Sequence, residues 1–361
     1  MPRNKRARKK GGGGGRPPSW AEFKHVGADE HAGIEDAPGE YVENETFREH
    51  VRGFLSDPNR KSVKQEFGEG WTNAMRYASY CLGDPKLKDP TIDALINEGK
   101  RNTEEVVRGV GHRLGETRTI DGAKKVILGV GRHSAKHAGI VARFVGGGVL
   151  KNPDAVPAAK EILIELGKNP DHAKEIARFM VPGLREDDEI EDEAGRRYYR
   201  SPKTAEDVLV GIGGHGREQA DTIIRFVAPR IGRKDNKAER RVLIKLAGQN
   251  IENGESVIRK MSRALGRPSE AEAATEVLIE TAKHSPEHAA LVSRFVLGGL
   301  NGTEARKAIK TVFKGMFKHF KKQDYHEHGV AAILPLKVCM GKDKDPRLRD
   351  AAIEVYKDIT G

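Results

Sequence analysis

Hydrophobic and polar positions follow two alternating helical patterns that recur about every 35 residues from about residue 70 onward. The first is a dense apolar patch, such as Ile162-Leu163-Ile164 or Val277-Leu278-Ile279. The second is amphipathic and carries an arginine followed by apolar residues. The clearest pair of copies, residues 158–173 and 273–289, differs by one inserted residue. Because each unit holds two helical patterns joined by a polar turn, the sequence predicts a tandem array of helical hairpins.

The second helix of each unit is predicted to bury one stripe and to hold an arginine opposite it. Counted from the arginine as position 0, apolar residues occupy positions −2, +2 and +6, and a small residue occupies position −5. At about 100° per residue, these four positions share one face of a helix. The arginines are Arg108, Arg143, Arg178, Arg225, Arg259 and Arg294.

A single hairpin of this kind cannot bury both of its faces, whereas stacked hairpins can. The sequence therefore predicts an all-α fold: a curved, right-handed α-solenoid of about eight ~35-residue helical hairpins. Residues 327–336 form a last copy without the arginine, and residues 347–359 form a lone first helix that closes the array. Over roughly residues 50–361, the pattern resembles the HEAT, armadillo and related helical-repeat proteins.

Proline and capping signals predict where several helices begin and end. Ser201-Pro202, Asn152-Pro153 and a Ser269…Glu272 capping box mark the starts of first helices. Pro182 and Pro229 interrupt two second helices late in their length. The period and these two breaks are also similar to TALE-like DNA-binding repeats, although the Gly-Gly-Lys-Gln run of that family is absent.

Charge divides the chain into three parts, although the formal net charge of +11 suggests a uniformly basic protein. Residues 1–20 are predicted to be a disordered basic arm, because they combine glycine and proline with seven bases and no acid. Residues 21–45 form an acidic, flexible segment, and residues 46–361 form the repeat domain. The bases of the arm are Arg3, Lys5, Arg6, Arg8, Lys9, Lys10 and Arg16.

Composition narrows the class of protein further. Charged residues make up 32% of the chain, and no apolar run approaches the ~20 residues that span a bilayer, which excludes a membrane protein. The two cysteines, Cys81 and Cys339, are isolated, which fits a reducing compartment. We therefore expect an intracellular protein that is cytoplasmic, or nuclear if its host is eukaryotic.

A glycine motif within residues 205–220 resembles a dinucleotide-binding fingerprint. Gly211-x-Gly213-x-x-Gly216 follows an apolar run, and Asp235 lies about 20 residues further on. The same slot lacks the fingerprint in four other copies, where it joins two helices, so these glycines are interpreted as the end of a first helix. The chain holds no other catalytic motif, and we expect no catalytic residue, no metal ligand and no cofactor.

The arginines have two interpretations. On the face opposite the core they form a column that could hold a polyanion, because guanidinium groups donate to phosphate or carboxylate. Alternatively, they form a salt-bridge ladder with nearby acids on the same helices. Those acids are Glu104, Glu175, Asp221 and Glu255.

Polar residues also recur at the turn between the two helices. One column comprises His133, Asn169, His215, Gln249 and His284, and the other comprises Asn102, His137, His172, Gln219, Asn253, His288 and His328. Some histidine pairs have metal-ligand spacing, but asparagine and glutamine hold zinc poorly. A repeated hydrogen bond across the turn explains all three residue types, and contact with a ligand is an alternative.

An insertion at residues 185–200 separates two copies, and insertions of this kind map to one face of a repeat array. It is interpreted as a solvated loop, with Tyr198 and Tyr199 as candidates for stacking on bases.

Together these features predict a non-enzymatic helical-repeat binding protein. The basic arm and the six repeated arginines favour association with nucleic acid, either RNA or DNA, or with ribonucleoprotein. The alternative is a protein–protein scaffold that holds a helix or an acidic peptide in its groove. No membrane partner is expected, and the sequence does not predict an oligomeric state.

Overall fold

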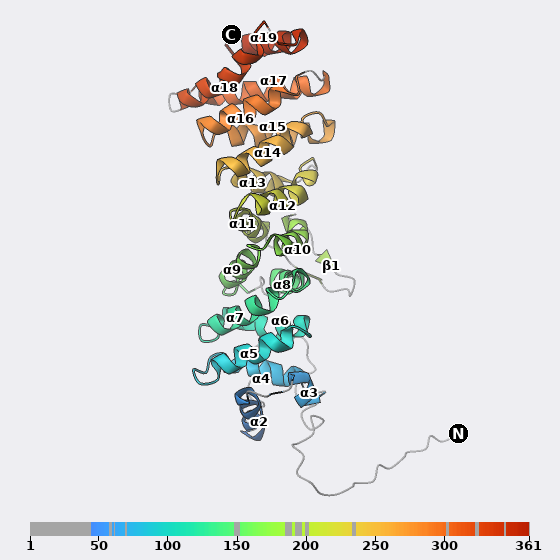
Figure 1. Cartoon of the computed structure of the whole chain (residues 1–361), viewed down its shortest axis with the longest axis vertical. Helices are drawn as coiled ribbons and strands as arrows, with labels where there is room; N and C mark the ends of the chain where they lie inside the picture. Colours follow the sequence, from blue (N-terminus) through green and yellow to red (C-terminus); the bar gives the residue numbers. More distant parts are fainter. Residues whose placement is uncertain are drawn as a thin grey trace, which may run out of the picture.

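The computed structural model describes residues 45–360, with gaps at 58–59, 61, 69–70, 148–151, 185–189, 192–196, 199–201, 233–235, 301–302, 322–324 and 343. The predicted basic arm (1–20) and nearly all of the predicted acidic segment (21–45) lie outside this part. The helices stack in sequence order into an elongated column, with α2 at one end and α19 at the other (Figure 1).

The column has two layers, because the first helices of successive repeats contact one another and so do the second helices. The first helices form the A layer: α5 (Lys88–Gly99), α7 (Ile120–Gly131), α9 (Val156–Leu166), α11 (Pro202–Gly213), α13 (Lys237–Ala247), α15 (Pro268–Ala282), α17 (Thr303–Phe320) and α19 (Pro346–Thr360). The second helices form the B layer: α4 (Trp71–Cys81), α6 (Thr103–Gly111), α8 (Ala135–Gly147), α10 (Pro170–Met180), α12 (Arg217–Val227), α14 (Ile251–Ala264), α16 (Pro286–Leu297) and α18 (His326–Cys339).

Seven hairpins run from α5–α6 to α17–α18. Before them, α2 (Glu45–Ser56) and α3 (Val63–Phe67) pack with α4, and α19 is a single last helix. This arrangement confirms the all-α solenoid of about eight hairpins. Within the insertion, β1 (Ile190–Glu191) pairs with β2 (Arg197–Tyr198) in antiparallel fashion.

The core runs the length of the column between the two layers. The predicted stripe of the second helices is buried: Ile176, Met180 and Leu184 of one repeat are 0–1% exposed. The apolar patches of the first helices are buried with it, as Ile162 and Leu163 show. Because each repeat shares its core with both neighbours, the array buries apolar side chains that one hairpin would expose.

Small residues at the ends of the A helices allow close packing between repeats. A Cβ added to Gly131 would lie 2.7 Å from a methyl carbon of Leu166, and one added to Gly213 would overlap Leu246. Gly211 and Gly213 both lie within α11, and α12 follows after a short turn. The interpretation of the glycine motif as a helix end is therefore confirmed, and the dinucleotide-binding alternative is wrong.

Helix boundaries followed the local signals only in part. Helix α11 begins at Pro202 as predicted, but α9 begins at Val156, because the Asn152 side chain instead accepts a hydrogen bond from the Asp154 amide (3.0 Å) in a preceding turn. Helix α15 begins at Pro268, so the capping box at Ser269 is wrong.

The predicted proline breaks are confirmed. Helix α10 ends at Met180 and α12 at Val227, and each continues into a short 3-10 turn, Val181–Leu184 and Ala228–Arg230. Proline lacks the amide hydrogen that would extend the helix, which explains the change at Pro182 and Pro229.

Candidate binding surface on the B layer

Three of the five polar residues that follow an A helix, His215, Gln249 and His284, hydrogen-bond to the preceding repeat. Nε2 of His215 lies 3.0 Å from the carbonyl oxygen of Ile164, and Nε2 of Gln249 lies 2.9 Å from that of Val210. These carbonyls belong to the last turn of an A helix, where backbone carbonyl groups have no amide donor within the helix. The predicted repeated hydrogen bond therefore exists in these copies, where it joins neighbouring repeats. Asn169 instead accepts hydrogen bonds across its own turn, from the amides of Asp171 and His172.

Four of the seven residues in the column that opens the B helices do the same, whereas Asn102 donates to Glu98 of its own hairpin. Gln219 donates to Lys168 (2.7 Å), Asn253 to Gly213 (3.2 Å), and the Nε2 atoms of His137 and His288 contact Lys100 (3.2 Å) and Ala247 (2.9 Å). The acceptor in each case is a backbone carbonyl at the end of the preceding A helix. Hydrogen bonding between repeats thus accounts for histidine, asparagine and glutamine at one position.

Burial disfavours the charged form of two histidines of this column. Burial lowers the pKa of His288, and the hydrogen bond to Ala247 only partly opposes that effect. Burial likewise lowers the pKa of His172. The lowered pKa favours the neutral form of both rings near pH 7, and the ring of His288 uses that form to hydrogen-bond to Ala247.

Several basic residues of the A layer are paired with acids of the neighbouring repeat. Lys124 lies 2.6 Å from Glu161, and Lys160 lies 2.7 Å from Asp207. Ion pairs of this kind join successive A helices and contribute little stability individually, but they neutralise the charge of this layer.

Glu206 of the A layer shows the same pairing at a buried position. Its side chain is 2% exposed and contacts Arg241 (2.9 Å) and Lys245 (2.5 Å) of α13. Burial favours a raised pKa, but hydrogen bonds from Lys245 and Arg241 outweigh it and hold the pKa of Glu206 below its usual range.

Neighbouring A helices also have complementary charge. Helix α13 carries four bases and one acid, α15 carries four acids and no base, and α17 carries five bases and one acid. Arg240 of α13 and Glu276 of α15 form one of the resulting ion pairs. The acids of α15 therefore compensate much of the positive charge of its two neighbours in the A layer.

The six repeated arginines lie on the outward side of the B helices, opposite the buried stripe, as predicted. We call this surface the arginine face. Arg143 is half-buried and the other five are exposed. The members are Arg108 on α6, Arg143 on α8, Arg178 on α10, Arg225 on α12, Arg259 on α14 and Arg294 on α16.

The predicted salt bridges are present for three of these arginines. Arg108 pairs with Glu104 (3.0 Å), Arg178 with Glu175 (3.5 Å) and Arg259 with Glu255 (2.5 Å), each within one helix. The fourth predicted acid, Asp221, lies 4.0 Å from Arg217 instead, so its assignment to Arg225 is wrong. Among the described residues, Arg225 and Arg294 have no acid within ion-pair distance. The ladder therefore does not neutralise the arginine face.

Phenylalanines lie beside the arginines, a feature that the sequence interpretation missed. The guanidinium carbon of Arg108 lies 5.3 Å from the ring centroid of Phe144 in the next repeat, and that of Arg143 lies 5.5 Å from the same ring. Arg259 lies 5.3 Å from the ring of Phe295, again one repeat further on. The available signal was an Arg-Phe pair in four of the six copies. Cation–π contact holds the guanidinium groups over these rings.

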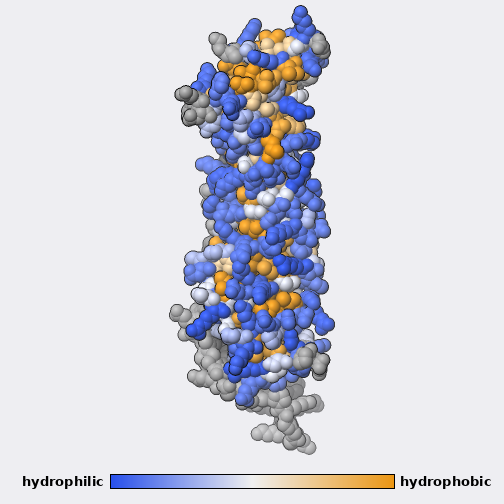
Figure 2. Space-filling view, turned by 60° about the vertical axis from the view of Figure 1, so that its left-hand side comes forward, coloured by the Kyte–Doolittle hydropathy of each residue, from blue (hydrophilic) through white to orange (hydrophobic). Residues whose placement is uncertain are grey.

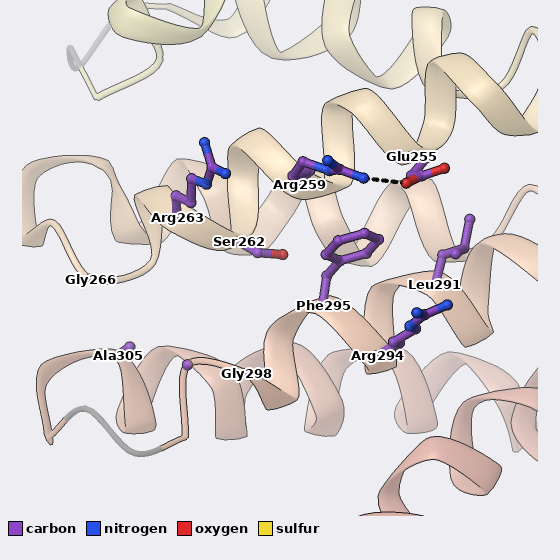
Figure 3. Close-up of a pocket in the computed structure, with 11 residues that line it drawn as sticks. Glu255, Arg259, Ser262, Arg263, Gly266, Leu291, Arg294, Phe295, Gly298 and Ala305 are labelled. Atoms are coloured by element: carbon purple, nitrogen blue, oxygen red, sulfur yellow. Dashed lines mark hydrogen bonds and ion pairs between the residues drawn. The ribbon is translucent and has the colours of Figure 1, made fainter.

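A groove of about 640 Å³ opens on the arginine face between α14 and α16 (Figure 3). Arg259 and Arg263 line it from α14, and Arg294 and Phe295 line it from α16. Glu255 is the acid in the lining, and it is paired with Arg259. The groove therefore combines three guanidinium groups with one partly exposed aromatic ring.

The other predicted site residues are not placed. The seven bases of the arm lie outside the described residues, and so do the side chains of Tyr198 and Tyr199 in the insertion. Among the described residues, no helix combines the length and the apolar character needed to cross a bilayer.

The two helical layers and the inter-repeat hydrogen bonds define an α-solenoid of the helical-repeat class. Comparison with models of protein families and with curated proteins gives no match. The chain is similar to PUF-8 in complex with PBE-RNA, at a TM-score of 0.32 and 9% identity, covering 88% of this chain and 91% of that one.

Two further solved structures show a comparable likeness. Importin beta matches at a TM-score of 0.30 and 11% identity, covering 88% of this chain and 51% of that one. A C-terminal fragment of the Chaetomium thermophilum cohesin loader SCC2 matches at 0.33 and 10%, covering 89% and 29%. Likenesses of this degree carry no inference about what the present chain binds.

Proposed function

We propose that this chain is a non-enzymatic helical-repeat protein that associates with nucleic acid or ribonucleoprotein through its arginine face and its N-terminal basic arm. The observation that carries the proposal is the groove that Arg259, Arg263 and Arg294 line together with Phe295. Phosphate groups accept hydrogen bonds from the guanidinium forks, and a base stacks on the exposed part of the ring. This combination favours a single-stranded segment, whose bases are free to stack.

The contrast between the two layers supports this choice of surface. Bases of the A layer, such as Lys124 and Lys160, are tied to acids of the next repeat. On the arginine face, Arg225 and Arg294 lack such partners among the described residues. A polyanion that binds the arginine face therefore displaces fewer ion pairs than one that binds the A layer.

The test is binding of labelled single-stranded RNA, single-stranded DNA and duplex DNA to the full chain at low and moderate salt. The double variant Arg263→Gln/Arg294→Gln removes two cations of the groove, and Arg240→Gln removes one cation of the A layer as a control. We expect the double variant to weaken binding of single strands at least tenfold and the control to change it less than twofold.

The contribution of the arm is separated by a second variant. Replacing its seven bases with glutamine should weaken binding of all three probes alike, because an extended cationic segment contacts phosphates without regard to sequence. Absence of binding to every probe at low salt would contradict the proposed function.

The protein-scaffold alternative is favoured by one feature of the same groove. Leu291 and Phe295 give it an apolar wall beside the arginines, which suits an acidic amphipathic peptide. Affinity capture with the full chain, with and without nuclease, separates the two functions. Protein partners that survive nuclease treatment and are lost in Arg263→Gln/Arg294→Gln would favour the scaffold.

A further inference from the structure

The arginine face becomes apolar at its last repeat. His288 opens α16 six residues before Arg294, and His328 opens α18 six residues before Leu334. Leu334 therefore occupies the position that holds arginine in six earlier copies. Val330 and Val338 lie four residues to either side of it, where the other copies hold mainly polar, charged or small residues.

These three residues form one exposed stripe along α18. Val330, Leu334 and Val338 are 48%, 58% and 63% exposed, and the i, i+4, i+8 spacing places them on one side of the helix. Ala332 and Leu336 are fully buried on the other side, and α18 packs on α16. The stripe holds three of the four large hydrophobic residues that are exposed among the described residues. In Figure 2, apolar surface gathers at the C-terminal end of the column, at the top.

Exposure of the stripe follows from its place in the repeat. Position 0 is exposed in α6, α10, α12, α14 and α16 even though each of these helices has a neighbour on both sides. A further repeat would therefore leave Leu334 uncovered. An apolar row at a position that faces solvent throughout the array is typical of a contact surface.

Charged residues at the edges of the stripe indicate what covers it. Glu327 and Lys337 are both exposed, and at 100° per residue both lie within about 60° of Leu334 around the helix. If two copies of α18 pack antiparallel with the two-fold axis at the level of Ala332, Val330 of each copy faces Leu334 of the other. The same arrangement places Glu327 of each copy opposite Lys337 of the other, so the surface is complementary to itself.

We propose that this stripe is a self-association surface, through which two copies of the chain pair by antiparallel packing of α18. A two-fold arrangement of this kind uses the same patch on both copies. Helix α18 has 14 residues, which corresponds to about 21 Å, so the contact is small and the dimer weak. The inference goes beyond the proposed function and does not rest on it.

Sedimentation velocity on the full chain tests the pairing, after nuclease treatment and at high salt so that nucleic acid cannot bridge two copies. Over about 1 to 100 µM, the wild-type chain should shift from monomer to dimer. Leu334→Arg restores the residue of the other copies and should weaken the dimer at least tenfold. Ile251→Arg changes the exposed hydrophobic residue that lies outside the stripe and should leave the dimer unchanged.

Charge reversal, measured after nuclease treatment and at low salt so that exposed charges are not screened, distinguishes antiparallel pairing from other arrangements. Glu327→Lys and Lys337→Glu should each weaken self-association, because each places like charges opposite one another at both ends. An equimolar mixture of the two variants should associate again, since every opposed pair in the mixed dimer then has opposite charge. A wild-type chain that stays monomeric, a dimer unaffected by Leu334→Arg, or a mixture that fails to associate would each overturn the proposal.

Discussion

Nε2 of His288 lies 2.9 Å from the carbonyl oxygen of Ala247, so the B helix of one repeat is bonded to the end of the A helix of the repeat before it. The other ring nitrogen lies 2.9 Å from the Ser285 hydroxyl, which also caps the same helix. Both ring nitrogens are therefore used at once, within the helix and between repeats. This arrangement couples the repeats through polar bonds as well as through the shared core.

Replacement of His288 should show whether its hydrogen bond or its volume contributes more to the free energy of unfolding. His288→Leu leaves the Ala247 carbonyl without this donor, and we expect a loss of about 1–3 kcal/mol in the free energy of unfolding. His288→Asn should cost less, because Asn253 makes the equivalent bond one repeat earlier. Urea unfolding followed by circular dichroism measures both. Equal losses for the two variants would show that the hydrogen bond is not what the position requires.

The same histidines predict how stability changes with pH. Because burial holds the pKa of His288 and His172 below the usual value of about 6.5, the unfolded chain binds protons that the folded chain does not. The free energy of unfolding should therefore fall as the pH drops from 7 through about 6.5, and continue to fall until the folded pKa is reached.

Melting temperatures between pH 7.5 and pH 5 check this expectation. The double variant His172→Asn/His288→Asn should lose less stability over that range than the wild-type chain. An identical pH dependence of the two proteins would rule out the histidines as its source.

Two glycines give predictions of opposite sign, because only Gly213 lies in the close packing between A helices. Gly213→Ala forces a methyl group against Leu246 and should cost about 1–3 kcal/mol. Gly109→Ala, in α6, meets only the Met75 methyl carbon at 3.7 Å and should stabilise the helix by about 0.5–1 kcal/mol. Thermal unfolding of the two variants measures the difference. A stabilised Gly213→Ala would mean that the A layer has more room than this packing allows.

The hydrophobic periodicity of the sequence predicted the features that depend on a single helix, namely which of its faces is buried. The 3.6-residue period placed Ile176 and Met180 in the core and Arg178 on the outside, because burial acts on whole faces. The carbonyl that Gln249 contacts belongs to a residue 39 positions away in the sequence. The two groups meet only because of the way the repeats stack, which the periodicity of one helix does not predict. The contact between Arg108 and Phe144 was missed for the same reason.

Capping and charge signals in the sequence predicted less well where a side chain can make either of two local contacts. The Asn152 side chain serves a turn before α9 instead of capping the helix, so the helix begins later than its Asn-Pro pair predicted. Asp221 can reach Arg217 or Arg225, both four residues away on the same helix. The sequence contains both choices, and only the folded geometry selects between them.

The proposed function requires that the arginine face, and not the A layer, binds a polyanion. The most direct measurement is the slope of the logarithm of the binding constant for single-stranded RNA against the logarithm of salt concentration. Each phosphate contact adds about 0.7 to the size of this slope for a single strand. In Arg225→Gln/Arg294→Gln the slope should shrink by about 1 to 1.5, whereas Lys124→Gln/Lys160→Gln should leave it unchanged. Equal changes in the two variants, or a larger change in the A-layer variant, would contradict binding at the arginine face.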